Sequence, residues 1–235
     1  MTLSIVPTPI GNLKDITLRA LAVLKEARLI VCEDTRRTRK LLDHHGLLEK
    51  DGMARCLLSF HEHSGEGRVR EILDKLREGE KVALVSDSGM PLISDPGFEL
   101  LREALRHGIP VQALPGPSAF VTALAASGLA ADAFSFFGFL SAKSSARRRK
   151  LAGLAAREET LVFYESPYRV LKVLQEMLEI FGDREAVVAR ELTKKFEEIS
   201  RGLLSELAAK FSARKIMGEF VILVSGANRK RIFSK

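Results

Sequence analysis

Short apolar runs alternate with amphipathic segments along the first half of the chain. An unbroken apolar run of about four residues is typical of a buried strand. Apolar residues spaced three and four apart are typical of a helix that packs on one side. The predicted strands are Leu3–Val6, Leu29–Cys32, Leu57–Phe60, Val82–Val85 and Val111–Leu114. The predicted helices are Thr17–Ala27, Thr38–His44, Gly67–Glu78 and Phe98–Arg106. This alternation predicts a parallel sheet covered by helices.

The second half resumes the alternation after a stiff break at Pro115-Gly116-Pro117. The break predicts a boundary between two α/β lobes, residues 1–115 and 116–235. Ser118 is placed to cap a helix that runs to about Ser127, and a second helix is predicted to begin with Ser166 and Pro167 and to stop at Gly182. A third is expected at Ser205–Phe211. The predicted strands are Phe134–Phe139, Thr160–Tyr164, Ala186–Ala189, Phe196–Arg201 and Glu219–Val224.

Composition places the chain among ordinary globular proteins. Its 235 residues are 46% hydrophobic, and no apolar run approaches the roughly 18–20 residues of a membrane span. The first residues do not have the pattern of a signal peptide. The two cysteines, Cys32 and Cys56, suggest neither a disulfide framework nor a metal site. These features favour a cytoplasmic protein without a metal.

The net charge of +7 is confined to the second half. Residues 1–115 hold 17 basic and 17 acidic side chains, whereas residues 116–235 hold 20 and 13. A solvated basic face is one explanation, and a phosphate-binding surface is the other. The uneven distribution favours phosphate binding. The excess charge is dense in the segment 143–150, which has few apolar anchors and is predicted to be mobile without its ligand. Its basic residues are Lys143, Arg147, Arg148, Arg149 and Lys150.

Two loops at predicted strand ends carry unusual residues, and ligands of open α/β sheets bind at such ends. Pro7–Leu13 contains two prolines, which remove the N–H donors that a phosphate cradle requires. This loop therefore favours a ligand without phosphates. Ser86–Gly97 places Asp87 directly after a buried strand, in a loop too rich in Gly and Pro for a simple connection. Gly89→Val is expected to obstruct a ligand here and to leave the fold intact.

Charged residues follow three further strands: Glu33, Asp34 and Arg36; Glu165; and Arg190, Glu191 and Lys194. Any one of these residues could be simply a helix cap or a member of an ion pair. The three groups together indicate a polar cleft between the lobes. His61-Glu62-His63 has two histidines near each other, yet no third ligand is apparent. A polar wall is favoured over a metal site there.

Long motifs identify a resemblance that spans Val6 to Val224. The chain resembles the methyltransferase I family, the 2′-O-methyltransferases of small-subunit ribosomal RNA within the tetrapyrrole-methylase-like superfamily. The resemblance implies a two-lobed class III methyltransferase fold, with a mostly parallel sheet in the first lobe and a mixed sheet in the second. The motifs are VPTPIGNLKDITLRAL, EDTRRTRKLL, SFHEHS, VALVSDSGMPLISDPG, ALPGPSA, FFGFL, LVFYESPYR, ARELTKKFEE and GEFVILV.

The resemblance also implies an activity and partners. It implies a homodimer that binds S-adenosylmethionine between its lobes and methylates a cytidine ribose 2′-hydroxyl in 16S ribosomal RNA, free or within the small subunit. With RNA as the substrate, the basic residues of the segment 143–150 are the predicted RNA-binding residues. The aromatic strand Phe134–Phe139 gives the dimer one physical support, because an alternating strand cannot bury four phenylalanines on one face. A sheet covered on both faces within one lobe is the alternative explanation.

The implied cofactor residues are Pro9, Ile10, Gly11, Asp87, Gly89, Met90, Pro91, Ser118, Ala119, Tyr164, Glu219 and Phe220. A base or a cation near the reacting hydroxyl should assist transfer, and the candidates are Glu33, Asp34, Arg36, Glu165, Arg190, Glu191 and Lys194. Four positions depart from the family pattern: Ser88, Met90, Ser141 and Tyr168. Met90 stands where the family usually has a threonine, so a role for a side-chain hydroxyl at this position is not expected. Tyr168 stands where the family usually has a histidine and is assigned no catalytic role.

Three alternative functions stay open. The same scaffold can methylate a tetrapyrrole carbon, which the basic second half disfavours. The chain can also be an RNA-binding assembly protein without catalysis, which the intact loops around Gly11 and Asp87 disfavour. A phosphate-handling enzyme is disfavoured by the two prolines of the first loop.

Overall fold

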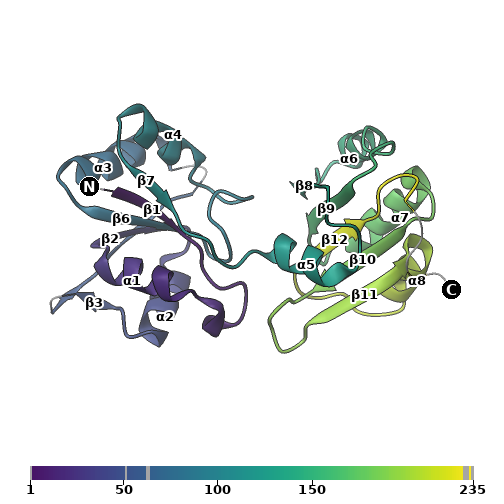
Figure 1. Cartoon of the computed structure of the whole chain (residues 1–235), viewed down its shortest axis with the longest axis horizontal. Coiled ribbons are helices and arrows are strands. Elements are labelled where there is room, and N and C mark those ends of the chain that lie inside the picture. The colour runs from purple at the N-terminus through teal and green to yellow at the C-terminus, as the bar shows by residue number, and fades with distance from the viewer. Residues whose placement is uncertain (1, 51, 62–63, 230–232, 234–235) are drawn as a thin grey trace. The chain divides into compact units, whose positions relative to one another are not determined.

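The computed structural model describes residues 2–50, 52–61, 64–229 and 233. The chain divides into two compact units, Met1–Ser118 and Ala119–Lys235 (Figure 1). In the described part of the chain, no helix combines the length and the apolar character needed to cross a membrane.

The first unit is built on a parallel five-stranded sheet with the order β5-β2-β6-β1-β7. Its strands are β1 (Thr2–Val6), β2 (Leu29–Cys32), β5 (Cys56–Ser59), β6 (Lys81–Val85) and β7 (Val111–Ala113). The strands are mostly apolar, because helices cover both faces of the sheet. The sequence prediction of a parallel sheet is confirmed.

Two pairs of helices cover this sheet on opposite faces (Figure 1). The helices α1 (Leu18–Glu26) and α2 (Thr35–His44) share one apolar cluster with Ile30 and Val85. The helices α3 (Gly65–Arg77) and α4 (Phe98–Arg106) share the other with Val31 and Leu84. Ile30 and Val31 of β2, and likewise Leu84 and Val85 of β6, therefore point to opposite faces of the sheet, as the two-residue period of a strand requires. The sequence did not predict the 3₁₀ turn η1 (Leu13–Asp15) or the small hairpin of β3 (Glu49–Lys50) and β4 (Met53–Ala54).

The second unit contains a mixed five-stranded sheet with the order β11-β10-β12-β9-β8. Its strands β8 (Phe134–Phe139) and β9 (Thr160–Glu165) are parallel, and the pairings of β10 (Glu185–Arg190), β11 (Glu198–Leu203) and β12 (Phe220–Val224) are antiparallel. This arrangement confirms the mixed sheet.

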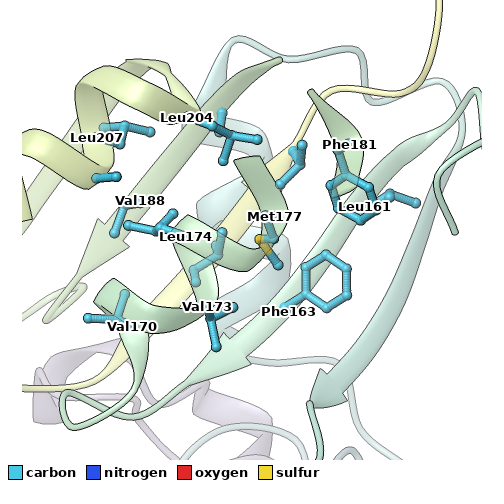
Figure 2. Close-up of a cluster of buried hydrophobic side chains, with 14 of the residues drawn as sticks. Leu161, Phe163, Val170, Val173, Leu174, Met177, Phe181, Val188, Leu204 and Leu207 are labelled. Carbon is cyan, nitrogen blue, oxygen red and sulfur yellow. The ribbon is translucent and has the colours of Figure 1, made fainter. Parts of the chain in front are cut away.

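Helices cover the second sheet unequally. The helices α6 (Ser144–Ala152), α7 (Val170–Phe181) and α8 (Leu204–Ser212) lie over one face, and α5 (Ala119–Ser127) contacts β12 and β9. The apolar stripe of α7, including Val173 and Met177, packs on Phe163 of β9 (Figure 2). These side chains are fully buried and form the core of this unit.

Several predicted boundaries were wrong by two residues or more. The helix α3 begins at Gly65 and not at Gly67. The helix α2 begins at Thr35 and not at Thr38, because the Asp34 side chain caps it by accepting a hydrogen bond from Arg36 N. The helix α7 begins at Val170, since residues 167–169 form a turn in which the carbonyl of Ser166 accepts hydrogen bonds from Arg169 N and Val170 N. The strand β11 starts at Glu198, two residues after the predicted Phe196.

Candidate functional site

The loops after β1 and β6 are joined by backbone and hydroxyl hydrogen bonds. Thr8 N donates to Gly89 O at 2.9 Å, and Gly89 N donates back to Thr8 O at 3.0 Å. The hydroxyl of Thr8 donates to Ser86 O at 3.0 Å, and that of Ser86 donates to Gly89 O at 3.1 Å. Two segments 78 residues apart therefore form one rigid surface at the carboxyl end of the sheet.

Gly89 occupies a backbone conformation that few other residues adopt. Its φ is 87°, in the region that favours glycine, and a Cβ at this position would lie 3.4 Å from Ile10 Cγ2. The expectation that Gly89→Val leaves the fold intact is therefore wrong, because a β-branched residue is strained at positive φ.

The predicted cofactor segments of the first unit meet at this surface. A Cβ on Gly116 would lie 2.7 Å from Pro7 Cβ, and one on Gly89 would lie 3.7 Å from Pro117 O. The proline-rich break therefore packs against both loops, and Ser118 ends the unit there. Pro9, Ile10 and Pro91 are buried, Gly11 is exposed, and Met90 and Ser118 are half-buried. Ala119 begins α5 of the second unit.

Asp87 links this surface to the loop after β2. Its Oδ1 accepts a hydrogen bond from Asp34 N at 3.0 Å, and its Oδ2 lies 3.5 Å from Arg37 Nε. The Asp34 carboxylate in turn binds Arg36 through Nε at 3.0 Å and Nη2 at 2.7 Å. The hydrogen bonds from Arg36 hold the pKa of Asp34 well below its usual range. Asp34 is therefore a weak base.

Asp95 is an ionisable residue of this region that the sequence analysis did not select. Burial, followed by the negative charge of Glu33, raises its pKa to about 7, although a hydrogen bond with Ser86 opposes the shift. A carboxyl group with this pKa exchanges protons near neutral pH. The segment Ser94-Asp95-Pro96-Gly97, in a long loop, is the feature of the sequence that could have drawn attention to Asp95. Its burial beside Glu33 is visible only in the fold.

In the second unit, strand register brings the other predicted residues to one end of the sheet. Phe220, at the start of β12, pairs with Glu165 at the end of β9 and with Arg190 at the end of β10. Tyr164 lies next to Glu165 and pairs with Val221. The prediction that Glu165 and Arg190 share one end of their sheet is confirmed.

Glu191, Lys194 and Glu219 form a compact ionic group at this end. Lys194 Nζ lies 2.9 Å from both Glu191 Oε1 and Glu219 Oε2, and Glu219 N donates to Glu191 Oε1 at 2.9 Å. Burial alone would raise the pKa of Glu191, but the hydrogen bonds from Lys194 and Glu219 N outweigh it and lower that pKa. Burial opposes the charge of Lys194 too, yet the two carboxylates raise the pKa of its ammonium. Lys194 is thus a fixed cation, and Glu191 is a fixed anion.

Glu165 is the most enclosed of the proposed catalytic residues. It is 2% exposed, and its Oε1 accepts a hydrogen bond from Ser166 N at 2.7 Å and an ion pair from Arg169 Nη2 at 2.7 Å. Oε2 has no hydrogen-bond partner among the described residues. These contacts favour an anchor for the turn after β9 over an accessible base.

The predicted basic segment Lys143–Lys150 differs from its prediction in two ways. It is a helix, α6, and not a mobile segment, because Ala, Leu, Arg and Lys favour helices and Arg147 anchors it. Arg147 is 1% exposed and bridges both carboxylate oxygens of Glu176, with Nη2 to Oε1 at 2.8 Å. Its selection as an RNA-binding residue is therefore contradicted.

The other basic residues of this segment remain at the surface. Lys143, Arg149 and Lys150 are exposed, whereas Arg148 is half-buried and lies 2.6 Å from Glu179. Lys150 lies over the ring of Phe137, with Nζ 5.0 Å from its centre. The polar wall predicted at His61-Glu62-His63 stays a prediction, since Glu62 and His63 lie outside the described residues.

The two α/β units and their strand-end loops agree with one protein family. The model of the tetrapyrrole (corrin/porphyrin) methylases matches residues 2–208, and the chain belongs to this family. Solved structures agree at the level of the fold. A cobalt precorrin-4 methyltransferase, CbiF, has a TM-score of 0.71 at 23% identity, over 95% of this chain and 94% of that one. The methyltransferase CobJ has a TM-score of 0.70 at 23% identity, over 98% of this chain and 95% of that one.

Within the family, the chain is similar to proteins named ribosomal RNA small subunit methyltransferase I. The relative from Thermotoga maritima is 49% identical over 95% of this chain and 98% of its own length. The relative from Vibrio cholerae is 50% identical over 95% of this chain and 77% of its own length. The Bacillus subtilis relative is 44% identical over 98% of this chain and 77% of its own length.

Proposed function

We propose that this protein transfers a methyl group from S-adenosylmethionine to the ribose 2′-hydroxyl of a cytidine in 16S ribosomal RNA. The observation that carries the proposal is its similarity, at 44–50% identity over nearly its whole length, to relatives named ribosomal RNA small subunit methyltransferase I. The net charge of +7 also supports an RNA substrate, because a positively charged protein attracts the negatively charged RNA backbone.

The residues of the first unit fit the methyl donor. When bound, S-adenosylmethionine supplies an electrophilic methyl group on a positively charged sulfur. Pro7 and Pro9 lack N–H groups for a phosphate, which the donor does not carry. Carboxylates gather at the ends of β2 and β6, where Glu33 and Asp87 both act on the pKa of Asp95. Such a negative region suits a cationic ligand.

Two residues suit the proton and charge changes of the reaction. A 2′-hydroxyl becomes a better nucleophile when a base removes its proton, and Asp95 has a pKa near neutrality. A cation stabilises negative charge that develops on the attacking oxygen, and Lys194 is held protonated by its two carboxylates. Arg36 is less suited, because both Asp34 oxygens already bind it.

The test is methyl transfer from radiolabelled S-adenosylmethionine to small ribosomal subunits and to free 16S ribosomal RNA. Mass mapping of the product should locate the label on a cytidine ribose. A parallel assay with a porphyrinogen as the methyl acceptor tests the alternative, methylation of a tetrapyrrole carbon. Label on the porphyrinogen and none on RNA would refute the proposal. Binding of RNA without any methyl transfer would indicate an assembly protein.

We also propose that the protein is a homodimer. Its support is the edge strand β8, on which Phe134 and Phe139 are 44% and 56% exposed. Exposed aromatic side chains on an unpaired edge are suited to contact with a second copy. Sedimentation at micromolar concentration should give the mass of two chains. A monomer would contradict the proposal.

A further inference from the structure

Four large apolar side chains are exposed at one end of the second unit. In the single chain, Tyr168 is 94% exposed, Phe196 65%, Phe139 56% and Met217 55%. Phe139 is the one already proposed to contact a second copy. Several exposed apolar side chains at one end of a unit are typical of a binding surface, because leaving them in water is unfavourable.

Strand register shows that these residues share one end of the sheet. Phe139 closes β8 and pairs with Tyr164 near the end of β9, and Tyr168 lies in the turn that follows β9. Phe196 lies in the connection between β10 and β11, whose ends Arg190 and Glu198 pair. Met217 lies just before β12, and its carbonyl accepts a hydrogen bond from Arg190 Nε at 2.6 Å.

The two most exposed rings are carried by well-ordered turns. Arg169, next to Tyr168, donates to Leu140 O at 3.2 Å and pairs with Glu165 at 2.7 Å, so the turn is tied to the end of β8. The loop of Phe196 is closed by Thr193 N donating to Glu197 Oε2 at 2.6 Å and by Glu197 N donating to Lys194 O at 3.1 Å. Rings on fixed supports lose little freedom on binding a flat partner.

The charges around these rings favour a nucleic acid over an apolar protein partner. Lys195 Nζ lies 5.7 Å from the centre of the Phe196 ring, and Lys215 is exposed near Met217. Neither lysine has an ion pair among the described residues. Aromatic rings interleaved with free cations are typical of surfaces that bind single-stranded nucleic acid.

Resting on the proposed function, we infer that Tyr168 and Phe196 form a stacking platform for unpaired bases of the RNA substrate. Unpaired bases expose their faces, and stacking on an aromatic side chain is how proteins most often bind them. The platform lies at the same end of the sheet as Phe220 and Lys194. A base stacked there brings its ribose towards Lys194, the cation of the proposed function.

The platform contributes base stacking more than phosphate binding. Most cations here are already neutralised: Lys194 by Glu191 and Glu219, and Arg169 by Glu165. Removing an aromatic ring should therefore weaken RNA binding without changing its dependence on salt, since that dependence counts phosphate contacts.

The absence of tryptophan from the sequence permits a direct test. Tyr168→Trp and Phe196→Trp each introduce a single fluorophore at the platform. Phe98→Trp introduces one on α4 of the first unit, where Phe98 is 68% exposed, and serves as the matched control. A short single-stranded oligoribonucleotide of 16S sequence should quench the first two variants and leave the control unchanged. Equal quenching of all three, or of none, would overturn the inference.

Alanine variants measure the strength of the platform. Tyr168→Ala and Phe196→Ala should each weaken binding of the same oligoribonucleotide roughly 5- to 100-fold, with an unchanged salt slope. Tyr168→Phe should retain binding, because the ring and not the hydroxyl stacks. Affinity for S-adenosylmethionine and the sedimentation coefficient should match those of the wild type.

The outcomes separate this inference from the proposed function. If the wild type binds and stacks RNA but methylates none, the proposed function fails and the platform stands. If the double alanine variant binds and methylates RNA as the wild type does, the platform is refuted. Loss of S-adenosylmethionine binding in the variant, or a change of oligomeric state, would also overturn it, since the rings would then contact the cofactor or a second copy.

Discussion

Arg147 and Glu176 form a buried ion pair in the second unit. Arg147 Nη1 also donates to Ser141 O at 2.9 Å and to Ala142 O at 3.2 Å, and Ser144 donates to Glu176 Oε1 at 2.8 Å. The pair therefore fixes the loop between β8 and α6. The hydrogen bonds with Arg147 lower the pKa of Glu176 although burial opposes this, so the pair stays ionised.

Breaking this pair should destabilise the protein severely. Glu176→Ala leaves a buried guanidinium without its carboxylate, which costs about 3–5 kcal/mol. Urea unfolding followed by circular dichroism should detect the loss, and Glu179→Ala, which removes an exposed partner of Arg148, should change stability by less than about 1 kcal/mol. Equal effects of the two variants would contradict the assignment of Arg147 to the interior.

Asp95 predicts a specific pH dependence. Its folded pKa, about 7, lies above the ordinary value of 3.8, so the folded state binds its proton more tightly than the unfolded state. The contribution of Asp95 to stability is therefore present at low pH and is lost as the pH rises through 7. Asp95→Asn removes the charge and should raise the free energy of unfolding at pH 8 by about 1–2 kcal/mol, after allowance for solvent screening.

The measurement is urea unfolding of both proteins between pH 4 and 8. The two stabilities should converge near pH 4, where the wild-type carboxyl is protonated. A constant difference across this range would exclude the raised pKa. If Asp95 also accepts the substrate proton, Asp95→Asn should lower kcat by about 10²- to 10⁴-fold.

At the scale of elements, α6 presents a basic face whose members differ in availability. Arg147 faces the interior, Arg148 is paired with Glu179, and Arg149 and Lys150 are exposed. The helix therefore offers fewer phosphate contacts than four consecutive basic residues suggest.

Replacing Arg149 and Lys150 by Ala should weaken RNA binding and reduce its log–log salt slope by about 1.4 for single-stranded RNA, which corresponds to two phosphate contacts. Affinity titrations at several salt concentrations measure this slope. Arg70→Ala removes an exposed charge from α3 and is the control. A slope that falls equally in both variants would show only an effect of net charge.

At the scale of the whole molecule, each unit contains its own apolar core. Two clusters, which include Leu84 and Ile30, lie entirely within the first unit, and the cluster around Phe163 lies entirely within the second. A domain with its own core has the means to fold alone.

We therefore expect the separate fragments 1–118 and 119–235 to fold. Each should unfold cooperatively on heating, as followed by circular dichroism, because burial within the unit supplies its stability. The intact chain provides the reference spectrum. A fragment without a cooperative transition would show that its core depends on the other unit.

The sequence alone predicted the order and type of most elements, because buried strands and amphipathic helices leave local periodic patterns. It did not predict the helix α6, the turn η1 or the hairpin of β3 and β4. The sequence also singled out the loops after β1 and β6 as candidate sites, since Pro, Gly and Asp after an apolar run act through backbone geometry that neighbours in the chain set. The family followed from motifs of the same local kind. Errors of helix boundary arose where one side chain, such as Asp34, decided where the helix began.

Only the tertiary structure decided which side chains are buried and with what partners. Arg147 and Arg149 are both basic and two residues apart, yet one is enclosed by Glu176, 29 residues later, and the other is in solvent. Burial, and then the negative charge of Glu33, raised the pKa of Asp95 to about 7, and strand register brought Tyr168 and Phe196 to one end of the sheet. Ionisation energies and surface composition depend on distances between segments remote in sequence, and such distances exist only after the chain has folded.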